Sequence, residues 1–231
     1  MITIPEKKLS SALNKLKSEC QFCKNKDTGS NLCDRCSVLT TAFNRYAMAN
    51  IPVDYWYLDM DKFNGEKILL QSYHLIADDI TKSYDDGASY CFAGGHGIGK
   101  SMVSTNILKR AVEKGYSALY TNLTDIVTIL TSYNYEEKRD TRQALLTVDF
   151  LVIDEFDPRF MGSDNASDLY GRILEPTLRH RIQNKLPIFF CSNSPNVTAS
   201  FHGSLKSSIS SLMNMVKPVM VLGQDYRKGI K

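Results

Sequence analysis

The segment FAGGHGIGKS at residues 92–101 constrains the fold more than any other part of the sequence. It overlaps a short apolar run, ASYCFAG, and leads into SMVSTNILKRAVEKG, whose apolar residues recur at helical spacing until Gly115. Two further apolar runs, DFLVIDE and LPIFFCSN, alternate with segments of helical pattern. Continuous apolar strands separated by helices predict an α/β fold, in which a parallel sheet is covered by helices on both faces.

The remaining pattern divides the chain into three parts. Apolar spacing predicts helices over 6–19, 37–52, 66–84, 125–134, 167–185 and 205–217, a strand over 117–122, and a loop over 54–67. We expect an N-terminal helix and cysteine module over 1–50, a linker over 51–65, and a larger domain over 66–231.

The glycine-rich loop matches G-x-x-x-x-G-K-[ST] in the strand–loop–helix context that this motif requires. Backbone N–H groups of such a loop wrap phosphates, and the N-terminus of the helix adds a partial positive charge. Lys100 is predicted to reach the β- and γ-phosphates of ATP, and the Ser101 hydroxyl to bind Mg²⁺. A chance match in a surface loop is the alternative, and the flanking strand and helix argue against it. The predicted nucleotide-binding loop comprises Gly94, Gly95, His96, Gly97, Ile98, Gly99, Lys100 and Ser101.

Polar residues follow two of the other predicted strands. Asp154 and Glu155 end the run FLVIDE, where a buried carboxylate needs a metal or a partner. We expect Asp154 to hold Mg²⁺ and Glu155 to act as the general base of a Mg²⁺-dependent ATPase. Asn193 ends LPIFFCSN and could bind the attacking water or the γ-phosphate, although an Asn before Ser-Pro is also common in turns. Two nearby carboxylates are expected to be solvated, Asp149 and Asp157.

Four of the six cysteines form a second motif, C-x₂-C-x₉-C-x₂-C. Two such hooks can bring four thiolates together around a structural Zn²⁺ ion, with no open position for catalysis. Disulfides are the alternative, which a reducing compartment disfavours. The predicted zinc ligands are Cys20, Cys23, Cys33 and Cys36.

Charge and hydropathy exclude some classes of protein. The net charge of +3 gives no overall field typical of a nucleic-acid-binding protein, so any such surface must be local. No apolar run approaches the roughly 20 residues of a membrane helix, and the N-terminus lacks the apolar core of a signal peptide. We therefore expect a cytoplasmic protein without a membrane partner.

These motifs together resemble the AAA+ ATPases of the helicase-loader group, the DnaC/DnaI-type loaders and the related IstB-type transposition helpers. The resemblance covers roughly residues 45–228 and includes the lead-in NRYAMANIPVDYW, GGHGIGKS, FLVIDE, LEPTLRHRIQNKLPIFFCSN and the closing DYR. It implies that the lead-in packs beside adenine, through Ile51, Pro52 and Tyr55; ordinary linker packing is the alternative. It also implies that the zinc module docks on a replicative, DnaB-type helicase, with single-stranded DNA contact by the module as the second reading.

The resemblance further implies an oligomer in which one subunit lends an arginine to the γ-phosphate held by the next. Here the sequence departs from the family, because LKSSISSLMNMVK contains no arginine. The substitutes are Lys206, Lys217, Arg179, Arg181 and Arg227, or self-assembly is weakened. Residues that could contact single-stranded DNA are Lys109, Arg110, Lys138, Arg139 and Arg142, with Tyr133 and Tyr135 between them.

The sequence thus predicts an ATP-dependent helicase loader that acts in replication initiation. Two alternatives remain at this point. A transposition helper ATPase would share nearly every ATPase residue, whereas a non-hydrolysing adaptor switched by nucleotide would not need Glu155.

Overall fold

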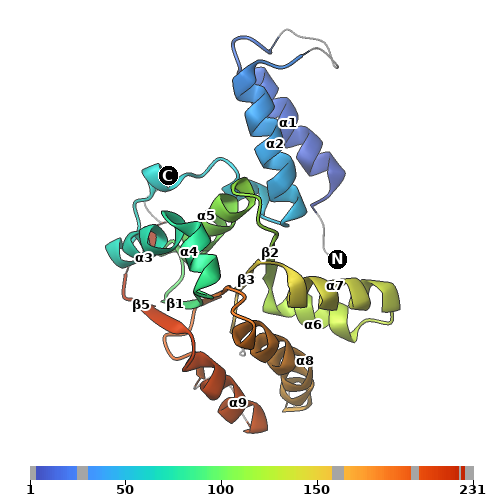
Figure 1. The fold of residues 1–231 in the computed structure, drawn as a ribbon, viewed down its shortest axis with the longest axis vertical. Coiled ribbons are helices and arrows are strands. Elements are labelled where there is room, and N and C mark those ends of the chain that lie inside the picture. Colours follow the sequence, from blue (N-terminus) through green and yellow to red (C-terminus); the bar gives the residue numbers. More distant parts are fainter. Residues whose placement is uncertain (1–3, 25–30, 158–163, 199–202, 224, 227–231) are drawn as a thin grey trace.

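The computed structural model describes residues 4–24, 31–157, 164–198, 203–223 and 225–226, without the side chains of 164–173, 203–205 and 208–209 (Figure 1). The elements in chain order are α1 (Glu6–Glu19), α2 (Asp34–Met48), η1 (Val53–Tyr55), η2 (Met60–Lys62), α3 (Lys67–Ala77), α4 (Ile80–Asp85), β1 (Tyr90–Gly94), α5 (Lys100–Glu113), β2 (Ala118–Asn122), α6 (Leu123–Thr131), α7 (Tyr135–Thr147), β3 (Phe150–Asp154), α8 (Asp164–Gln183), β4 (Ile188–Ser192), α9 (Gly203–Met213) and β5 (Lys217–Val221).

Within the described residues the strands form one five-stranded sheet in the order β2-β3-β4-β1-β5, and every pairing is parallel. Alternate residues of each strand enter different cores, because successive side chains point to opposite faces. Phe92, Val152 and Phe189 pack with α3, α4 and α5, whereas Ile153 and Phe190 pack with α6, α7, α8 and α9. The predicted α/β architecture, with helices on both faces, is confirmed.

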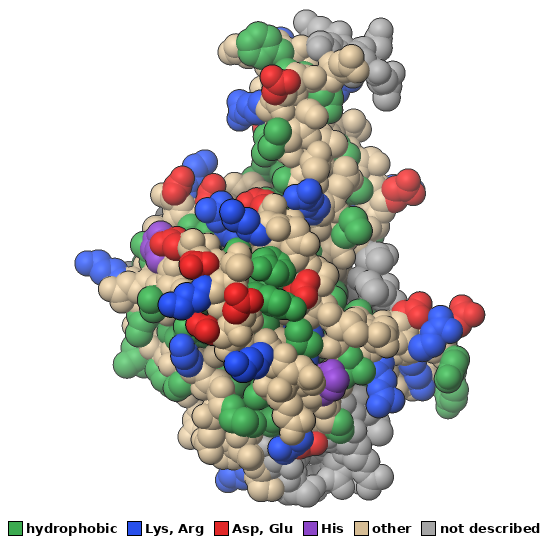
Figure 2. Space-filling view, in the orientation of Figure 1, with side chains coloured by type: hydrophobic (Ala, Val, Ile, Leu, Met, Phe, Trp, Pro, Cys, Tyr) green, Lys and Arg blue, Asp and Glu red, His purple; other side chains and the backbone are tan. Residues whose placement is uncertain are grey.

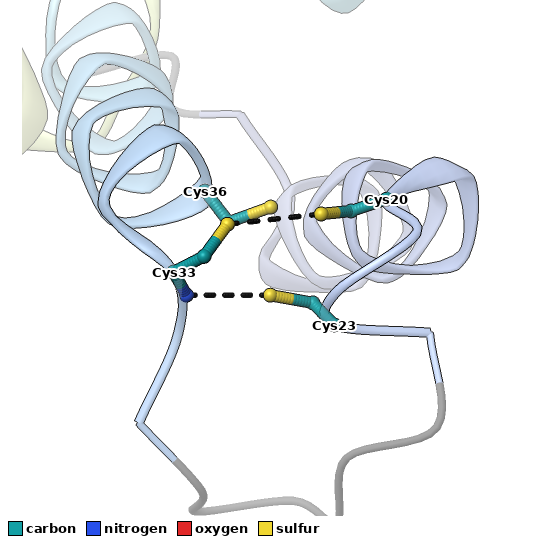
Figure 3. A group of neighbouring side chains, drawn as sticks. All are labelled: Cys20, Cys23, Cys33 and Cys36. Atoms are coloured by element: carbon teal, nitrogen blue, oxygen red, sulfur yellow. Dashed lines mark hydrogen bonds between the residues drawn. The ribbon is translucent and has the colours of Figure 1, made fainter.

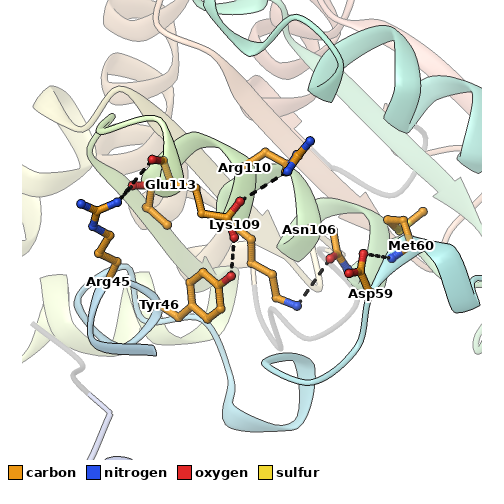
Figure 4. A network of polar contacts seen from close by, with 9 residues as sticks. Arg45, Tyr46, Asp59, Met60, Asn106, Lys109, Arg110 and Glu113 are labelled. Atoms are coloured by element: carbon orange, nitrogen blue, oxygen red, sulfur yellow. Dashed lines mark hydrogen bonds and ion pairs between the residues drawn. The ribbon is translucent and has the colours of Figure 1, made fainter. Parts of the chain in front are cut away.

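Most of the α1–α2 hairpin stands away from the sheet, and the end of α2 lies against it (Figure 1). There the rings of Phe43, Tyr46 and Trp56 contact one another in tilted and edge-on arrangements and join the core on the α5 side. The Tyr46 hydroxyl donates to Glu113 Oε1 at 2.5 Å, and Arg45 donates to the carbonyl oxygens of Val112 and Glu113 at 3.3 Å (Figure 4). The C-terminal end of α5 is therefore where the hairpin is attached.

Besides shifts of a few residues at helix ends, the structure differs from the predicted elements in three places. The helix expected over 66–84 is broken at Asp79, whose side chain accepts a hydrogen bond from Lys82 N at 3.0 Å and starts α4 as a new helix. Helix α7 was not predicted, because its exposed face is highly charged; Asn134 caps it by accepting from Glu137 N. The helix expected over 205–217 ends at Met213, and Lys217 instead begins β5, which pairs with β1.

Burial of charged side chains corrects three expectations, which concern Lys109, Asp157 and Arg181. Lys109 is only 6% exposed and donates to the carbonyl oxygens of Trp56 and Leu58, so it cannot contact DNA. Burial lowers the pKa of Lys109 to about 8. Asp157 is buried rather than solvated, whereas Asp149 is half-buried and accepts hydrogen bonds from Ser117.

Arg181 is fully buried and so is unable to reach a neighbouring subunit. Its guanidinium donates to the carbonyl oxygens of Leu145, Asp149 and Pro187 at 3.0–3.1 Å, which joins the end of α7 to the starts of β3 and β4. Burial lowers the pKa of this guanidinium to about 10. Arg181 is therefore a structural residue. No helix among the described residues is long and apolar enough to cross a membrane.

An Arg181→Met variant is expected to lose about 3 kcal/mol of unfolding free energy, because three buried carbonyl oxygens each lose a charged donor and only that of Pro187 keeps another, the N–H of Leu151. Urea denaturation followed by circular dichroism measures the difference. Arg179→Met is the matched control from the same helix: it removes only a partly exposed ion pair with Glu175, which contributes less than about 1 kcal/mol. Equal losses in the two variants would contradict the structural role of Arg181.

Candidate nucleotide-binding site and cysteine cluster

The glycine-rich loop leaves β1 and enters α5 in a conformation that depends on two glycines. Gly99 precedes α5 with φ of +101°, a region that other residues avoid, and a Cβ there would lie 2.5 Å from the ring of Phe63. A Cβ on Gly94 would collide with the carbonyl oxygen of Val221 in β5. The loop is thus packed closely between the linker and the edge strand, and this fixes the direction in which α5 begins.

Lys100 lies at the first position of α5 and its side chain turns back into the loop. The ammonium donates to the carbonyl oxygens of Gly94 at 2.9 Å and Gly95 at 2.6 Å, and to Asn193 Oδ1 at 3.0 Å. The side chain is 6% exposed. The structure therefore brings together Lys100 and Asn193, two predicted site residues that are far apart in the sequence.

Asp154 lies at the carboxyl end of β3, on the same side of the sheet as the glycine-rich loop and Asn193, since β4 lies between β1 and β3 and all three strands are parallel. Its carboxylate is 8% exposed and both oxygens are held. The Tyr120 hydroxyl donates to Oδ2 at 2.5 Å, and the backbone N–H of Glu155 donates to Oδ1 at 2.7 Å. Burial, followed by the Asp154 charge, raises the pKa of Tyr120, so this hydroxyl keeps its proton.

Glu155 is exposed because the chain turns sharply after β3. Its φ is +49°, a left-handed conformation that is uncommon outside glycine. The next residue, Phe156, is fully buried against Phe190 and its N–H donates to the carbonyl oxygen of Cys191 at 2.8 Å. Anchoring of Phe156 in the core thus leaves the Glu155 carboxylate at the surface beside the sheet edge.

These residues fit a magnesium nucleotide. Carboxylate and hydroxyl oxygens are the ligands that Mg²⁺ uses in proteins, directly or through water, and Asp154 and Ser101 supply them. Each Asp154 oxygen accepts one hydrogen bond from the described residues and has a second lone-pair site for a metal-bound water. The chemistry that the predicted Mg²⁺ site needs is therefore present.

Two aromatic residues outside the motif, Phe63 and Tyr226, contact the glycine-rich loop. Phe63, in the linker, contacts Gly99; the sequence did not single it out, because an aromatic residue in a loop carries no signal for such a role. Tyr226 N donates to the carbonyl oxygen of Gly97 at 3.2 Å, and its hydroxyl donates to Glu66 Oε1 at 2.7 Å. Tyr55 lies in η1 and is half-buried. Its contact with adenine stays a prediction.

The four cysteines of the second motif meet at the far end of the α1–α2 hairpin (Figure 3). Their sulfur atoms lie within 4.8 Å of one another, with Cys20 Sγ and Cys33 Sγ 3.7 Å apart. Four sulfurs at 2.3 Å from a central ion in a tetrahedron would lie about 3.8 Å apart. The N–H of Cys33 donates to Cys23 Sγ at 3.3 Å, as backbone amides do around thiolates. The cluster is built to hold a metal ion.

The thiols of this cluster differ in acidity. A backbone hydrogen bond at Phe22 lowers the pKa of Cys20 to about 6, whereas burial raises the pKa of Cys36 to about 12. Without a cation, neighbouring thiolates disfavour one another; a bound metal would deprotonate coordinating thiols. Cys91 and Cys191 lie outside the cluster, and burial raises the pKa of each.

The candidate DNA contacts lie on two surfaces. Arg110 is exposed on α5 and pairs with Glu113. The α6–α7 hairpin projects from the body, and acidic and basic side chains gather together at its end (Figure 2). Tyr133 and Tyr135 are exposed there; of the basic residues, Arg139 and Arg142 are exposed and Lys138 is half-buried. A purely basic track is therefore not formed.

The candidates for the arginine or lysine that would contact the γ-phosphate held by a neighbouring subunit lie on different elements. Arg179 pairs with Glu175 at 2.6 Å, and Lys217 lies over the ring of Tyr90. Lys206 is exposed on α9, and Arg227 lies outside the described residues. Only Arg181 is excluded, by its burial.

Comparison with known proteins agrees with this geometry. Residues 73–181 match the family of IstB-like ATP-binding proteins. Over 119 residues the chain is 26% identical to the "Replicative helicase loader DnaI" of Bacillus subtilis (strain 168), a match that spans 50% of this chain and 37% of the relative.

Two solved structures share the fold. The DnaC helicase loader superposes with a TM-score of 0.57 at 18% identity, over 74% of this chain and 100% of that chain. The replication initiator DnaA bound to AMPPCP and single-stranded DNA has a TM-score of 0.57 at 16% identity, over 75% of this chain and 51% of that one. By sequence the chain is therefore similar to the IstB-like ATP-binding proteins and to a replicative helicase loader, and it shares its fold with the DnaC helicase loader and with DnaA.

Proposed function

We propose that this protein is a Mg²⁺-dependent ATPase that loads a replicative helicase onto single-stranded DNA. The observation that carries the proposal is the contact of Lys100 with Asn193, at the sheet edge where Asp154 also ends its strand. A phosphate-binding lysine, a metal-binding carboxylate and a polar sensor at adjacent strand ends are the parts that hydrolysis of a γ-phosphate needs.

Each residue has a role in the proposal. The loop amides and Lys100 bind the phosphates, and Asn193 orients the γ-phosphate or the attacking water. Ser101 and Asp154 would hold Mg²⁺, which neutralises developing phosphate charge when bound. Glu155, exposed beside the edge, takes the proton of the attacking water.

The cysteine cluster supports a docking role for the hairpin, with residues 1–50 as a zinc module, 51–65 as a lead-in and 66–231 as the ATPase domain. The cluster lies far from the ATP site, at the free end of α1 and α2 (Figure 1). Phe22, next to the cluster, is 76% exposed, which suits contact with another protein. The partner we propose is a DnaB-type helicase, since the relative at 26% identity is named a helicase loader. Self-association into an oligomer is part of the same proposal.

A transposition helper ATPase is the second candidate, because the family that matches residues 73–181 is described as IstB-like. The two functions differ in partner and in nucleic acid. Filaments on double-stranded DNA would favour the helper, whereas helicase capture and a preference for single-stranded DNA would favour the loader. A non-hydrolysing adaptor would bind ATP without turnover.

Glu155→Gln is expected to lower the kcat of ATP hydrolysis about 100-fold or more, because the amide cannot accept a proton from water. ATP affinity should change little, since Glu155 is not part of the loop. Phosphate release measures the rate, and binding of a fluorescent ATP analogue measures affinity. Asp149→Asn, at the opposite end of β3, is the matched control and should hydrolyse ATP at the parental rate. Parental turnover in Glu155→Gln would remove this residue from the general-base role.

The purified chain is expected to contain one Zn²⁺ ion, because four thiolates at these distances complete a tetrahedral shell. Cys20→Ser should retain far less zinc, and its hairpin should be cleaved faster by protease. Cys91→Ala, a buried cysteine outside the cluster, should keep the metal. Elemental analysis after gel filtration gives the metal content. Equal zinc in both variants would contradict the assignment.

Capture of a replicative helicase by the immobilised chain tests the docking role. The wild type should retain the helicase, and Cys20→Ser should lose it because the docking end no longer folds around its metal. Lys100→Ala should still retain the helicase but should no longer respond to added ATP. If the wild type captured no helicase, the loader function would be wrong even if ATP were hydrolysed.

A further inference from the structure

We infer that Tyr120 is a positioning residue for the metal-binding carboxylate, and that the end of α2 holds Tyr120 in place. The inference rests on the proposed function, because it concerns how Asp154 is presented to a magnesium nucleotide. Tyr120 belongs to no sequence motif of the site. Its position comes from the structure alone.

The first step concerns the side chain. The Tyr120 hydroxyl donates to Asp154 Oδ2 at 2.5 Å, while the N–H of Glu155 donates to Oδ1 at 2.7 Å. One donor on each oxygen fixes the rotation of the carboxylate about its χ2 angle, which is otherwise broad. Without Tyr120 the carboxylate keeps only the hydrogen bond from its own chain neighbour. Partners of this kind, one shell away from a metal, orient the ligands that bind it.

The sheet register explains how Tyr120 reaches this carboxylate. Tyr120 pairs with Val152 and Asn122 pairs with Asp154, so the hydroxyl spans the diagonal between neighbouring strands. Diagonal neighbours lie about 7–8 Å apart, within reach of a long aromatic side chain. A phenylalanine at this position would fill the same space and lack only the donor.

The second step concerns the backbone of Tyr120. Its N–H donates to the carbonyl oxygen of Ala49 at 2.8 Å, and its own carbonyl oxygen accepts from Asn50 Nδ2 at 2.9 Å. Both partners belong to the turn that ends α2. Strand β2 is the edge of the sheet, so this turn takes the place that a further strand would occupy. Asn50 is 9% exposed and adopts φ of +55°, which holds its amide toward β2.

Together these contacts connect two regions. Cys36 lies in the first turns of α2, and Ala49 and Asn50 follow its last turn. A movement of α2 that breaks the contacts of Ala49 and Asn50 removes the outer support of β2, which is then held by β3 alone, and so loosens the position of Tyr120 beside Asp154. We therefore infer that the orientation of the Asp154 carboxylate depends on the position of the α1–α2 hairpin.

The test is a titration of Mg²⁺ against a fixed concentration of a fluorescent ATP analogue, together with binding of the analogue in EDTA. Tyr120→Phe should bind the analogue in EDTA as the wild type does, and should need about ten-fold more Mg²⁺ to reach the magnesium-bound state. Asn50→Gly keeps the positive φ but loses the amide, and should move the Mg²⁺ midpoint in the same direction by a smaller factor. Tyr116→Phe is the matched control, with its ring against Tyr84 and Phe150, and should not move the midpoint.

The outcomes separate the possibilities. An unchanged Mg²⁺ midpoint in Tyr120→Phe, or an equal loss of affinity with Mg²⁺ and with EDTA, would overturn the positioning role. An effect of Tyr120→Phe without any effect of Asn50→Gly would overturn the part played by α2. Binding that depends on Mg²⁺ and on Tyr120, without hydrolysis by the wild type, would contradict only the proposed ATPase function. Wild-type binding that ignores Mg²⁺ would overturn the inference itself.

Discussion

Helix α5 is buried along most of its length, and its two ends meet different partners. At its start, Lys100 turns back into the glycine-rich loop and reaches Asn193. At its end, the carbonyl oxygens of Val112 and Glu113 accept hydrogen bonds from Arg45 in α2. Every residue from Val103 to Lys109 is buried against the sheet and the linker. The helix therefore cannot shift at one end without disturbing packing at the other, and the phosphate site and the hairpin share one rigid element.

Buried polar groups reinforce this arrangement. Burial removes Lys109 from water and lowers its pKa to about 8, and its ammonium donates hydrogen bonds to the carbonyl oxygens of Trp56 and Leu58 in place of water. Its ammonium also lies 5.5 Å from the centre of the Tyr46 ring. Because these partners come from the linker and α2, the lysine orients both against α5 (Figure 4). A hydrophobic residue of the same size would pack there and would not specify which carbonyl oxygens face the helix.

Much of the fold and of the candidate ATP site can be predicted from patterns within short segments of the sequence. Period and turn residues predict α1, α5 and the four buried strands, and the spacing of glycines and cysteines predicts two sites, because each of these signals lies within a short segment. Helix α7 was not predicted, since its many charged residues leave too few apolar ones, such as Ala144 and Leu145, to show a helical period. Strand β5 was not predicted because its alternation is brief and follows a helix. Burial of Lys109 and Arg181 depends on contacts between distant segments, and single residues give no sign of it.

The geometry of the candidate site also depends on residues outside its motifs. Asp154 lies at a strand end that a sequence can locate, but its orientation depends on a hydroxyl from the neighbouring strand, and that strand is held by the turn after α2. A module joined to an ATPase by a flexible tether could deliver a partner without affecting chemistry. Here the hairpin is joined to the larger domain by a packed junction, in which Trp56 donates to the carbonyl oxygen of Ile51 and its ring packs at a tilt against Phe43. Any partner that bends α2 on binding must act on this junction, so the proposed docking at the hairpin and the orientation of the Asp154 carboxylate are physically joined.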